Sequence, residues 1–200
     1  MTRQQRGEET RMQLLRAATR RFAQNGYDAT GVAEICETAG VSKGAFYHHF
    51  ASKQAVFLEL LNGWMEELER ALERTAAGAK TVPERLSRMA QMMRIILQSE
   101  TAQLPMFLEF WTHASRDASV REATRVPYRR YQAYFAELIQ KGIDEGSLDT
   151  IDPIMGAQAI ISLASGFLLQ GLMDPDEADW GVVSEEGIRI LLDGLRRRGE

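Results

Sequence analysis

The chain has 200 residues, which is enough for one large domain or two small ones to bury a core without disulfides or a structural metal. Its composition, 44% hydrophobic and 26% charged with a single cysteine, excludes a disordered chain, a collagen-like chain and a disulfide scaffold. The net charge of −4 at pH 7 argues at first against a nucleic acid as the partner.

That average hides a division of charge along the chain. Residues 1–55 carry eight basic and five acidic side chains, a net charge of +3, whereas residues 56–200 carry 16 basic and 23 acidic side chains, a net charge of −7. Such an asymmetry favours a basic head that meets a polyanion, although chance is the alternative. Basic residues at the start are followed by no apolar stretch, so no signal peptide is predicted, and the lone Cys36 fits a reducing cytoplasm.

Apolar residues recur with helical spacing almost throughout, and no long stretch alternates with period two, so the predicted fold is all-α with about nine helices. In chain order the predicted helices cover about residues 14–25, 32–39, 43–50, 53–78, 83–97, 106–114, 120–142, 153–173 and 185–198. Four serines are expected to cap the helices that follow them: Ser42, Ser52, Ser119 and Ser184. Pro127 is expected to kink or break its helix.

The segment from Ile154 to Met173 has twenty residues without a charge, the length of a bilayer span. It contains polar residues, is flanked by aspartates and lacks the basic anchors typical of spans. We therefore expect no membrane association but a helix buried on most sides inside protein. Its small residues would let a helix of a second copy of the chain approach closely.

Residues 32–50 have the pattern of a helix, a glycine-containing turn and a second helix, which predicts a helix-turn-helix. Gly40 is expected to turn the chain, because glycine adopts the left-handed conformation without steric cost. Ser42, Lys43 and Gly44 then place a hydroxyl, a cation and free backbone N–H groups at a helix N-terminus, which favours a phosphate. Gly44 also leaves room for a sugar-phosphate backbone.

The second helix of this motif is expected to turn Phe46 and Phe50 inward, so Tyr47 and His48 must lie on its other faces. Lys53 adds a further cation at the start of the next helix. Which residue would read bases stays open, because this helix lacks Arg, Asn and Gln, the usual bidentate readers.

At these residues the sequence resembles the TetR family of bacterial transcriptional repressors. The similarity follows the segments 30–35, 39–50 and 52–53, covers about residues 8–68, and continues loosely over residues 142–153. Gly31 stands where the family often has Ser or Thr, which leaves Thr30 as the expected helix cap and phosphate contact. Ala45 stands where a Thr is common, which removes one hydroxyl.

The resemblance implies an all-helical homodimer in the bacterial cytoplasm, associated with the nucleoid and bound to a palindromic double-stranded DNA operator. Residues 8–68 would form the DNA-binding domain, with the motif at 31–50, and residues 69–200 a helical domain for effector binding and dimerisation. By position, the DNA contacts would be Thr30, Ser42, Lys43, Gly44, Tyr47, His48 and Lys53. An effector bound to the second domain would release the operator.

The last two helices would pair with those of the second copy in a four-helix bundle. The residues expected at this interface are Gly156, Ser162, Gly166, Leu169, Ile188, Leu191 and Leu195.

The middle of the chain is rich in sulfur and aromatic side chains, which suit a pocket for a small hydrophobic or aromatic effector, although such residues also fill plain cores. The pocket candidates are Met89, Met93, Phe107, Phe110, Trp111, His113 and Tyr131.

Glu109, His113 and Asp117 stand four residues apart and could share a helix face, a spacing that can chelate a metal. Surface pairing, or one polar anchor in the pocket, is the alternative, and neither a metal nor another cofactor is predicted. No nucleophile elbow, phosphate-binding glycine loop or zinc-protease motif is present in the sequence, so an enzyme is not predicted. An adaptor with a vestigial helix-turn-helix is the third class.

Overall fold

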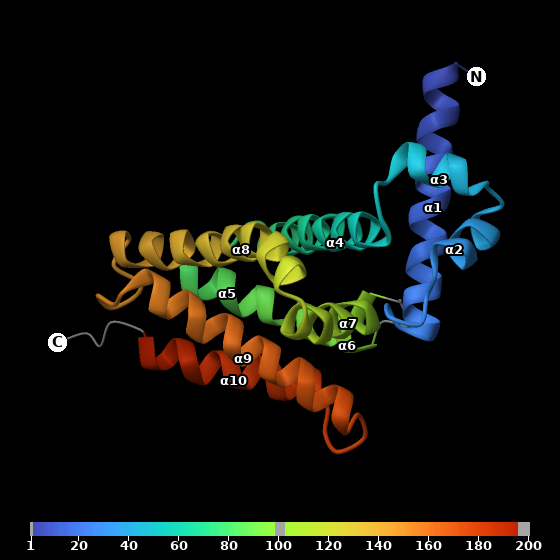
Figure 1. Cartoon of the computed structure of the whole chain (residues 1–200). Helices are drawn as coiled ribbons and strands as arrows, with labels where there is room; N and C mark the ends of the chain where they lie inside the picture. The colour runs from blue at the N-terminus through green and yellow to red at the C-terminus, as the bar shows by residue number, and fades with distance from the viewer. Residues whose placement is uncertain (1, 99–102, 196–200) are drawn as a thin grey trace. The chain divides into compact units, whose positions relative to one another are not determined.

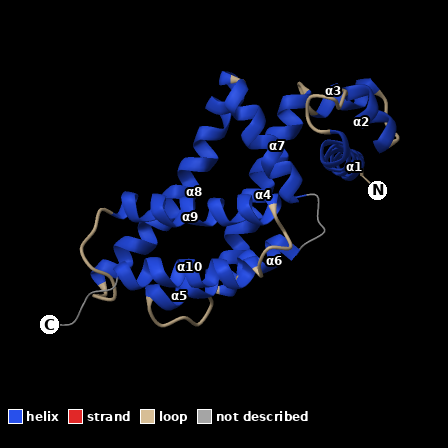
Figure 2. Cartoon of the chain, turned by 90° about the horizontal axis from the view of Figure 1, so that it is seen from below, coloured by secondary structure: helices blue, strands red, loops and turns tan. Residues whose placement is uncertain are grey.

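The computed structural model describes residues 2–98 and 103–195, without the side chains of residues 3, 98, 103–107, 109 and 110. These residues form ten helices and no strand (Figure 1 and Figure 2), which confirms the all-α prediction. The helices are α1 (Arg3–Asn25), α2 (Val32–Ala39), α3 (Lys43–His49), α4 (Lys53–Thr75), α5 (Val82–Ala90), α6 (Met92–Gln98), α7 (Gln103–Arg116), α8 (Ala118–Asp144), α9 (Pro153–Met173) and α10 (Trp180–Leu195).

The described chain has one helix more than predicted, because the stretch 83–97 forms two helices, α5 and α6. Between them the N–H of Gln91 donates to the carbonyl of Arg88, only three residues back, at 3.1 Å, which tightens the chain into a turn. Pro127 lies inside α8, and the helix continues past it without a break.

Two of the four predicted serine caps are present. Ser42 accepts the N–H of Ala45, and Ser52 accepts the N–H of Ala55 at 3.0 Å. The other two predictions are wrong, because a carboxylate occupies each of these helix starts and a carboxylate also complements the helix dipole.

At α8, Asp117 accepts the backbone N–H groups of Ser119 and Val120, so Ser119 donates to the cap instead of being one. At α10, Asp179 accepts the N–H groups of Gly181 and Val182. Ser184 lies inside that helix, is buried, and donates its hydroxyl to the carbonyl of Trp180 at 2.6 Å.

The chain divides into two compact units. The first contains the described parts of residues 1–66 and 101–126, which include α1 to α3, the first half of α4, α7 and the start of α8. The second contains the described parts of residues 67–100 and 127–200. The DNA-binding domain expected over residues 8–68 therefore packs with a segment of the chain, within residues 101–126, that lies far along the sequence.

The core of the first unit is built by aromatic and aliphatic side chains from α1 to α4. Phe22 and Phe57 are fully buried and meet edge to face, with ring centroids 5.7 Å apart. A buried side chain of this size contributes roughly 1.5–3 kcal/mol relative to exposure. Cys36 is part of the same core, and burial raises the pKa of its thiol, so the thiol stays protonated at neutral pH.

The second unit packs α10 against α5, α6 and α9, and α9 and α10 run side by side in both views. Its core draws on residues from α4, α5, α6, α8, α9 and α10, among them Leu72, Leu86, Ile139, Ile160 and Leu192.

The single chain leaves much of the apolar segment 154–173 uncovered, so its predicted burial on most sides would require the partner helix of a second copy. Only 28% of the most apolar window of α9 is buried, and Met155, Leu169 and Met173 are exposed. By length and composition alone this helix could cross a membrane, a test that the core helices of soluble proteins also pass.

Candidate nucleic-acid interface

The turn between α2 and α3 follows from one glycine. Gly40 has φ +68°, in the left-handed region that L side chains rarely adopt. Its conformation lets the N–H of Val41 donate back to the carbonyl of Cys36 at 3.0 Å, which ends α2 and redirects the chain. Ser42 then caps α3, so the two helices have the geometry expected for residues 32–50.

The structure brings five of the seven predicted DNA contacts together at the exposed side of α3: Ser42, Lys43, Gly44, Tyr47 and His48. Phe46 and Phe50 are buried on its opposite side, as expected. Tyr47 is 57% exposed, and its ring rests edge-on against Phe46 at 5.3 Å.

The start of α3 is open. A Cβ built on Gly44 would find its nearest neighbour, the Ser42 hydroxyl, 3.7 Å away, so no side chain covers the backbone there. Exposed N–H groups at a helix start, beside the Lys43 ammonium, suit a phosphate oxygen.

Thr30 does not take the role that the sequence suggested. It is fully buried, and its hydroxyl donates to the carbonyl of Gly26 at 2.8 Å. The residue that caps α2 is Gly31, whose N–H donates to a carboxylate oxygen of Glu34 at 2.7 Å. The prediction of Thr30 as cap and phosphate contact is therefore wrong, because its hydroxyl is used inside the chain.

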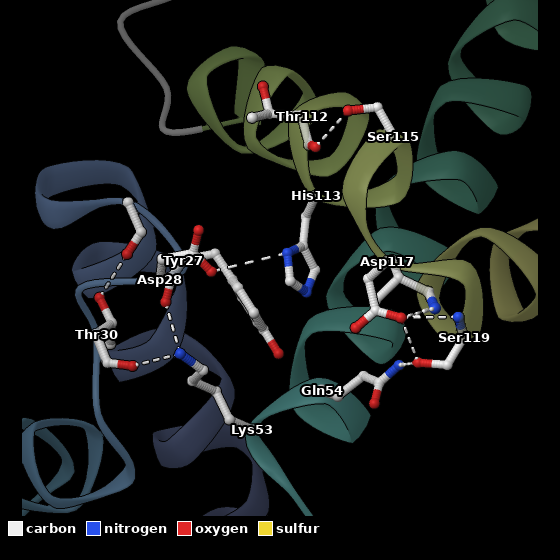
Figure 3. Close-up of polar contacts among 12 residues, drawn as sticks. Tyr27, Asp28, Thr30, Lys53, Gln54, Thr112, His113, Ser115, Asp117 and Ser119 are labelled. Atoms are coloured by element: carbon white, nitrogen blue, oxygen red, sulfur yellow. Dashed lines mark hydrogen bonds and ion pairs between the residues drawn. The ribbon is translucent and has the colours of Figure 1, made fainter.

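Lys53 is also turned inward (Figure 3). Its Nζ donates to the carbonyls of Tyr27 and Thr30 at 2.7 and 2.8 Å and lies 4.1 Å from the centre of the Tyr27 ring. Burial lowers the pKa of this ammonium, while the carboxylates of Asp28 and Glu34 oppose that shift. Lys53 thus holds the loop between α1 and α2 instead of extending into solvent.

Sequence reasoning missed the contact between this loop and α7. His113 of α7 packs its ring on Tyr27, with centroids 4.2 Å apart, and its Nδ1 lies 3.7 Å from a carboxylate oxygen of Asp28 (Figure 3). His113 was a pocket candidate, but the structure places it within the first unit, against the head. No local spacing signals this pairing, because the partners are far apart in sequence.

The start of α8 is attached to α4 in the same unit. Gln54 donates to the hydroxyl of Ser119 at 3.0 Å, and that hydroxyl donates to Asp117 at 2.7 Å. Asp117 accepts three hydrogen bonds, from the Ser119 hydroxyl and from the backbone N–H groups of Ser119 and Val120. These hydrogen bonds lower the pKa of its carboxyl. The residues that the structure describes hold no cluster of three metal-ligating side chains, and the side chain of Glu109 lies outside them.

The remaining pocket candidates are divided between settings. Met89 is buried in the core of the second unit, Met93 is buried as well, and Tyr131 packs partly buried against that core, where burial raises the pKa of its hydroxyl. Trp111 is exposed in the first unit. The side chains of the other two candidates, Phe107 and Phe110, lie outside the described residues.

The predicted interface residues are divided as well. Ser162 and Leu169 are exposed on α9, and a Cβ at Gly166 would meet nothing within 4 Å. Gly156 and Ile188 instead face their own chain: a Cβ on Gly156 would lie 2.8 Å from Ile151, and Ile188 is part of the core. These two are corrected to intrachain packing, and Leu191 and Leu195 lie partly buried against the same core.

Two stretches of the chain match known families. Residues 14–60 match the family described as bacterial regulatory proteins, tetR family, and residues 82–197 match the one described as BetI-type transcriptional repressor, C-terminal. The chain belongs to the TetR family of transcriptional regulators. It is therefore a helix-turn-helix, DNA-binding regulator and not an enzyme.

Two relatives support this assignment. The HTH-type transcriptional repressor KstR2 of Mycobacterium tuberculosis is 30% identical over 138 residues, which cover 68% of each chain. The HTH-type transcriptional regulator BetI of Vibrio campbellii is 23% identical over 188 residues, 93% of this chain and 90% of that one.

Solved structures show the same TetR-family fold. A transcriptional regulator of Pseudomonas aeruginosa PAO1 has a TM-score of 0.81 at 21% identity, over 97% of this chain and 91% of that one. A regulator of Saccharomonospora viridis in complex with choline has 0.78 at 20% identity, over 96% and 100%. FadR of Bacillus subtilis in complex with stearoyl-CoA has 0.79 at 20% identity, over 92% and 99%.

Proposed function

We propose that this TetR-family regulator is a repressor that binds a palindromic operator through α3 and releases it when a small hydrophobic effector binds the C-terminal domain. The observation that carries the proposal is the exposed side of α3, where Ser42, Lys43, Gly44, Tyr47 and His48 lie together. A cation and open N–H groups at a helix start favour phosphates, and the projecting tyrosine adds contact area at the groove edge.

A second copy of the chain supplies the two-fold symmetry that a palindrome needs. Along α9 a stripe of small or apolar residues runs through Met155, Ser162, Gly166, Leu169 and Met173, spaced by one or two helical turns. All of them are exposed except Gly166, whose exposure is intermediate. On α10, Val182 and Ile190 are also exposed. An apolar stripe of this length on a soluble regulator favours burial against an identical stripe. The two α3 helices of such a dimer would lie about 34–36 Å apart, or a multiple of one DNA turn.

The effector class rests on composition and on similar proteins. The middle of the chain carries four closely spaced methionines, Met89, Met92, Met93 and Met106, and methionine is an adaptable residue that suits apolar ligands. FadR, similar in fold, holds stearoyl-CoA, and the Saccharomonospora viridis regulator holds choline. An apolar or aromatic ligand is therefore the class that we propose, with the protein acting in the cytoplasm at the nucleoid.

Selection of bound sequences from random double-stranded DNA tests the operator. We expect enrichment of an inverted repeat, and retention of that DNA in a gel shift that is lost with Tyr47→Ala. If no sequence is enriched over the starting pool, the regulator does not read an operator and the proposal fails.

The effector is then tested on the selected DNA with stearoyl-CoA, and with free coenzyme A as its matched control without the acyl chain. Release by the acyl compound or by an aromatic acid, but not by coenzyme A, supports a hydrophobic effector. Release by polar compounds alone would contradict the proposed ligand class.

A further inference from the structure

The loop between α1 and α2 is contacted by three helices of the first unit, and Figure 3 shows Lys53 of α4 and His113 of α7 directed at it. The ring of Tyr27 meets Phe22 of α1 at 5.3 Å, Phe57 of α4 at 4.7 Å and His113 of α7 at 4.2 Å, measured between ring centroids. The Lys53 ammonium lies over the same ring. One aromatic side chain therefore joins three helices.

Hydrogen bonds hold the backbone of the loop in addition to the ring contacts of Tyr27. The Lys53 ammonium donates two hydrogen bonds, to the carbonyls of Tyr27 and Thr30. The hydroxyl of Thr30 donates to the carbonyl of Gly26. Thr30 is followed directly by Gly31, the cap of α2. The position of α2 thus depends on where this loop lies.

Helix α2 in turn positions α3. The two helices share the core of the head through Ile35 and Phe46, and the short turn at Gly40 leaves them little freedom. A displacement of the loop would therefore move the exposed side of α3, although no residue of the loop needs to touch DNA.

Helix α7 reaches this loop through one side chain. The imidazole of His113 is mostly buried between Tyr27 and Phe57, and its Nδ1 faces the exposed carboxylate of Asp28 at 3.7 Å. The same helix carries Phe107, Phe110 and Trp111, which the sequence suggests for the effector pocket.

We infer that His113 is a positioning residue for DNA binding: packed on Tyr27, it holds the α1–α2 loop, with Lys53, in the arrangement that presents α3 to the operator. A ligand that shifts α7 would then lower operator affinity by withdrawing this ring. The inference rests on the proposed function and specifies the residues through which the operator-binding helix responds to α7. Coupling between sites in proteins is typically 5- to 150-fold in affinity.

The test compares His113→Ala with Thr112→Ala, an exposed neighbour on the same helix, as the matched control. Affinity for the selected operator is measured by fluorescence anisotropy over a series of salt concentrations. We expect His113→Ala to bind about 5- to 20-fold more weakly at every salt concentration, with an unchanged salt slope, since it touches no phosphate. Thr112→Ala should match the wild type.

A second measurement does not depend on DNA. Amide hydrogen exchange over residues 26–39 should be faster in His113→Ala than in the wild type, because the loop has lost one of its supports. His113→Phe keeps a ring against Tyr27 and should recover affinity to within about 3-fold of the wild type, which also guards against a variant that fails to fold.

Wild-type affinity together with wild-type exchange in His113→Ala overturns the inference and leaves the proposed function intact, since the wild type would still bind its operator. Failure of the wild type to select any operator removes the proposed function, and this inference falls with it.

Discussion

Two glycines in the DNA-binding head are needed for different reasons. Gly40 has φ +68°, so any side chain there strains the backbone even though nothing lies within 4 Å of its Cβ position. Gly44 is helical, and a Cβ there would make only an ordinary contact with Ser42. Gly40 therefore serves the fold, whereas Gly44 leaves the start of α3 open for a ligand.

These roles predict opposite results for two alanine variants. Gly40→Ala should lower the free energy of unfolding by roughly 1–2 kcal/mol, because it forces a side chain into the left-handed region. Gly44→Ala should leave stability unchanged or raise it by up to about 1 kcal/mol, yet weaken operator binding, because its methyl group faces the DNA backbone. Urea unfolding and anisotropy measure the two effects, and full binding by Gly44→Ala would contradict the placement of the phosphate.

Two lysines ten positions apart differ in the same way. Lys43 is exposed at the start of α3, so Lys43→Ala should reduce the salt slope of DNA binding by about 1 without changing stability. Lys53→Ala should instead destabilise the head by roughly 1–3 kcal/mol, because two carbonyls lose their donor. Denaturation and salt titration of both variants decide this, and equal salt slopes would show that the assignment is wrong.

At the scale of elements, α4 is connected to its neighbours by a polar cluster at its C-terminal end. Glu73 of α4 accepts hydrogen bonds from Arg85 of α5 and from the hydroxyl of Tyr134 of α8. Burial raises the pKa of the Glu73 carboxyl, but the two hydrogen bonds and the positive charges of Arg85 and Lys141 together outweigh it, so this pKa lies below its ordinary value of 4.5. One carboxylate thus joins three helices of the second unit.

This cluster predicts a pH-dependent loss of stability. A lowered carboxyl pKa means that the unfolded state binds more protons, so the stabilisation is present above about pH 4.5 and is lost as the pH falls through the lower folded value. Tyr134→Phe should cost up to about 1 kcal/mol at pH 7, limited because the Glu73 side chain is 44% exposed. The difference in urea stability between the variant and the wild type should shrink as the pH is lowered from 7 through the folded pKa of Glu73. A difference that stays constant down to about pH 2 would contradict this role for Glu73.

At the scale of the whole molecule, the single chain leaves an apolar stripe on α9 exposed. A helix with exposed Met155, Leu169 and Met173 is costly in water, and a second copy that covers it would remove the cost. Residues 56–200 carry a net charge of −7, so we expect DNA to repel this part of the chain and to be bound by the basic head alone.

Leu169→Glu should therefore convert the proposed dimer to monomers, because it places a charge in the apolar stripe. Operator affinity should then fall, since the two half-sites of the proposed palindrome would no longer be bound together. Leu169 is 52% exposed in the single chain, so the helical content of the variant should equal that of the wild type. Val126→Glu, at a residue 75% exposed on α8 and outside the stripe, is the matched control. Sedimentation at micromolar concentration measures both, and a Leu169→Glu variant that remains dimeric would exclude this interface.

Features set by neighbours in sequence could be predicted from the chain alone. The helical class, the turn at Gly40, the caps at Ser42 and Ser52 and the inward side of α3 all depend on residues within one or two turns. Local spacing decides these features because the hydrogen bonds and faces of a helix repeat every three to four residues. The uneven charge of head and body is likewise a property of the chain itself.

Only the tertiary structure decided how the polar groups of the head are used. Thr30 and Lys53 fitted phosphate contacts by position, yet the Lys53 ammonium donates to carbonyls 26 and 23 residues away, and Thr30 is fully buried within the loop between α1 and α2. His113 lies against Tyr27 from a helix that the sequence assigned to another domain. A buried polar group takes the partner that packing brings to it, and that partner is set by the path of the whole chain, which local spacing does not encode.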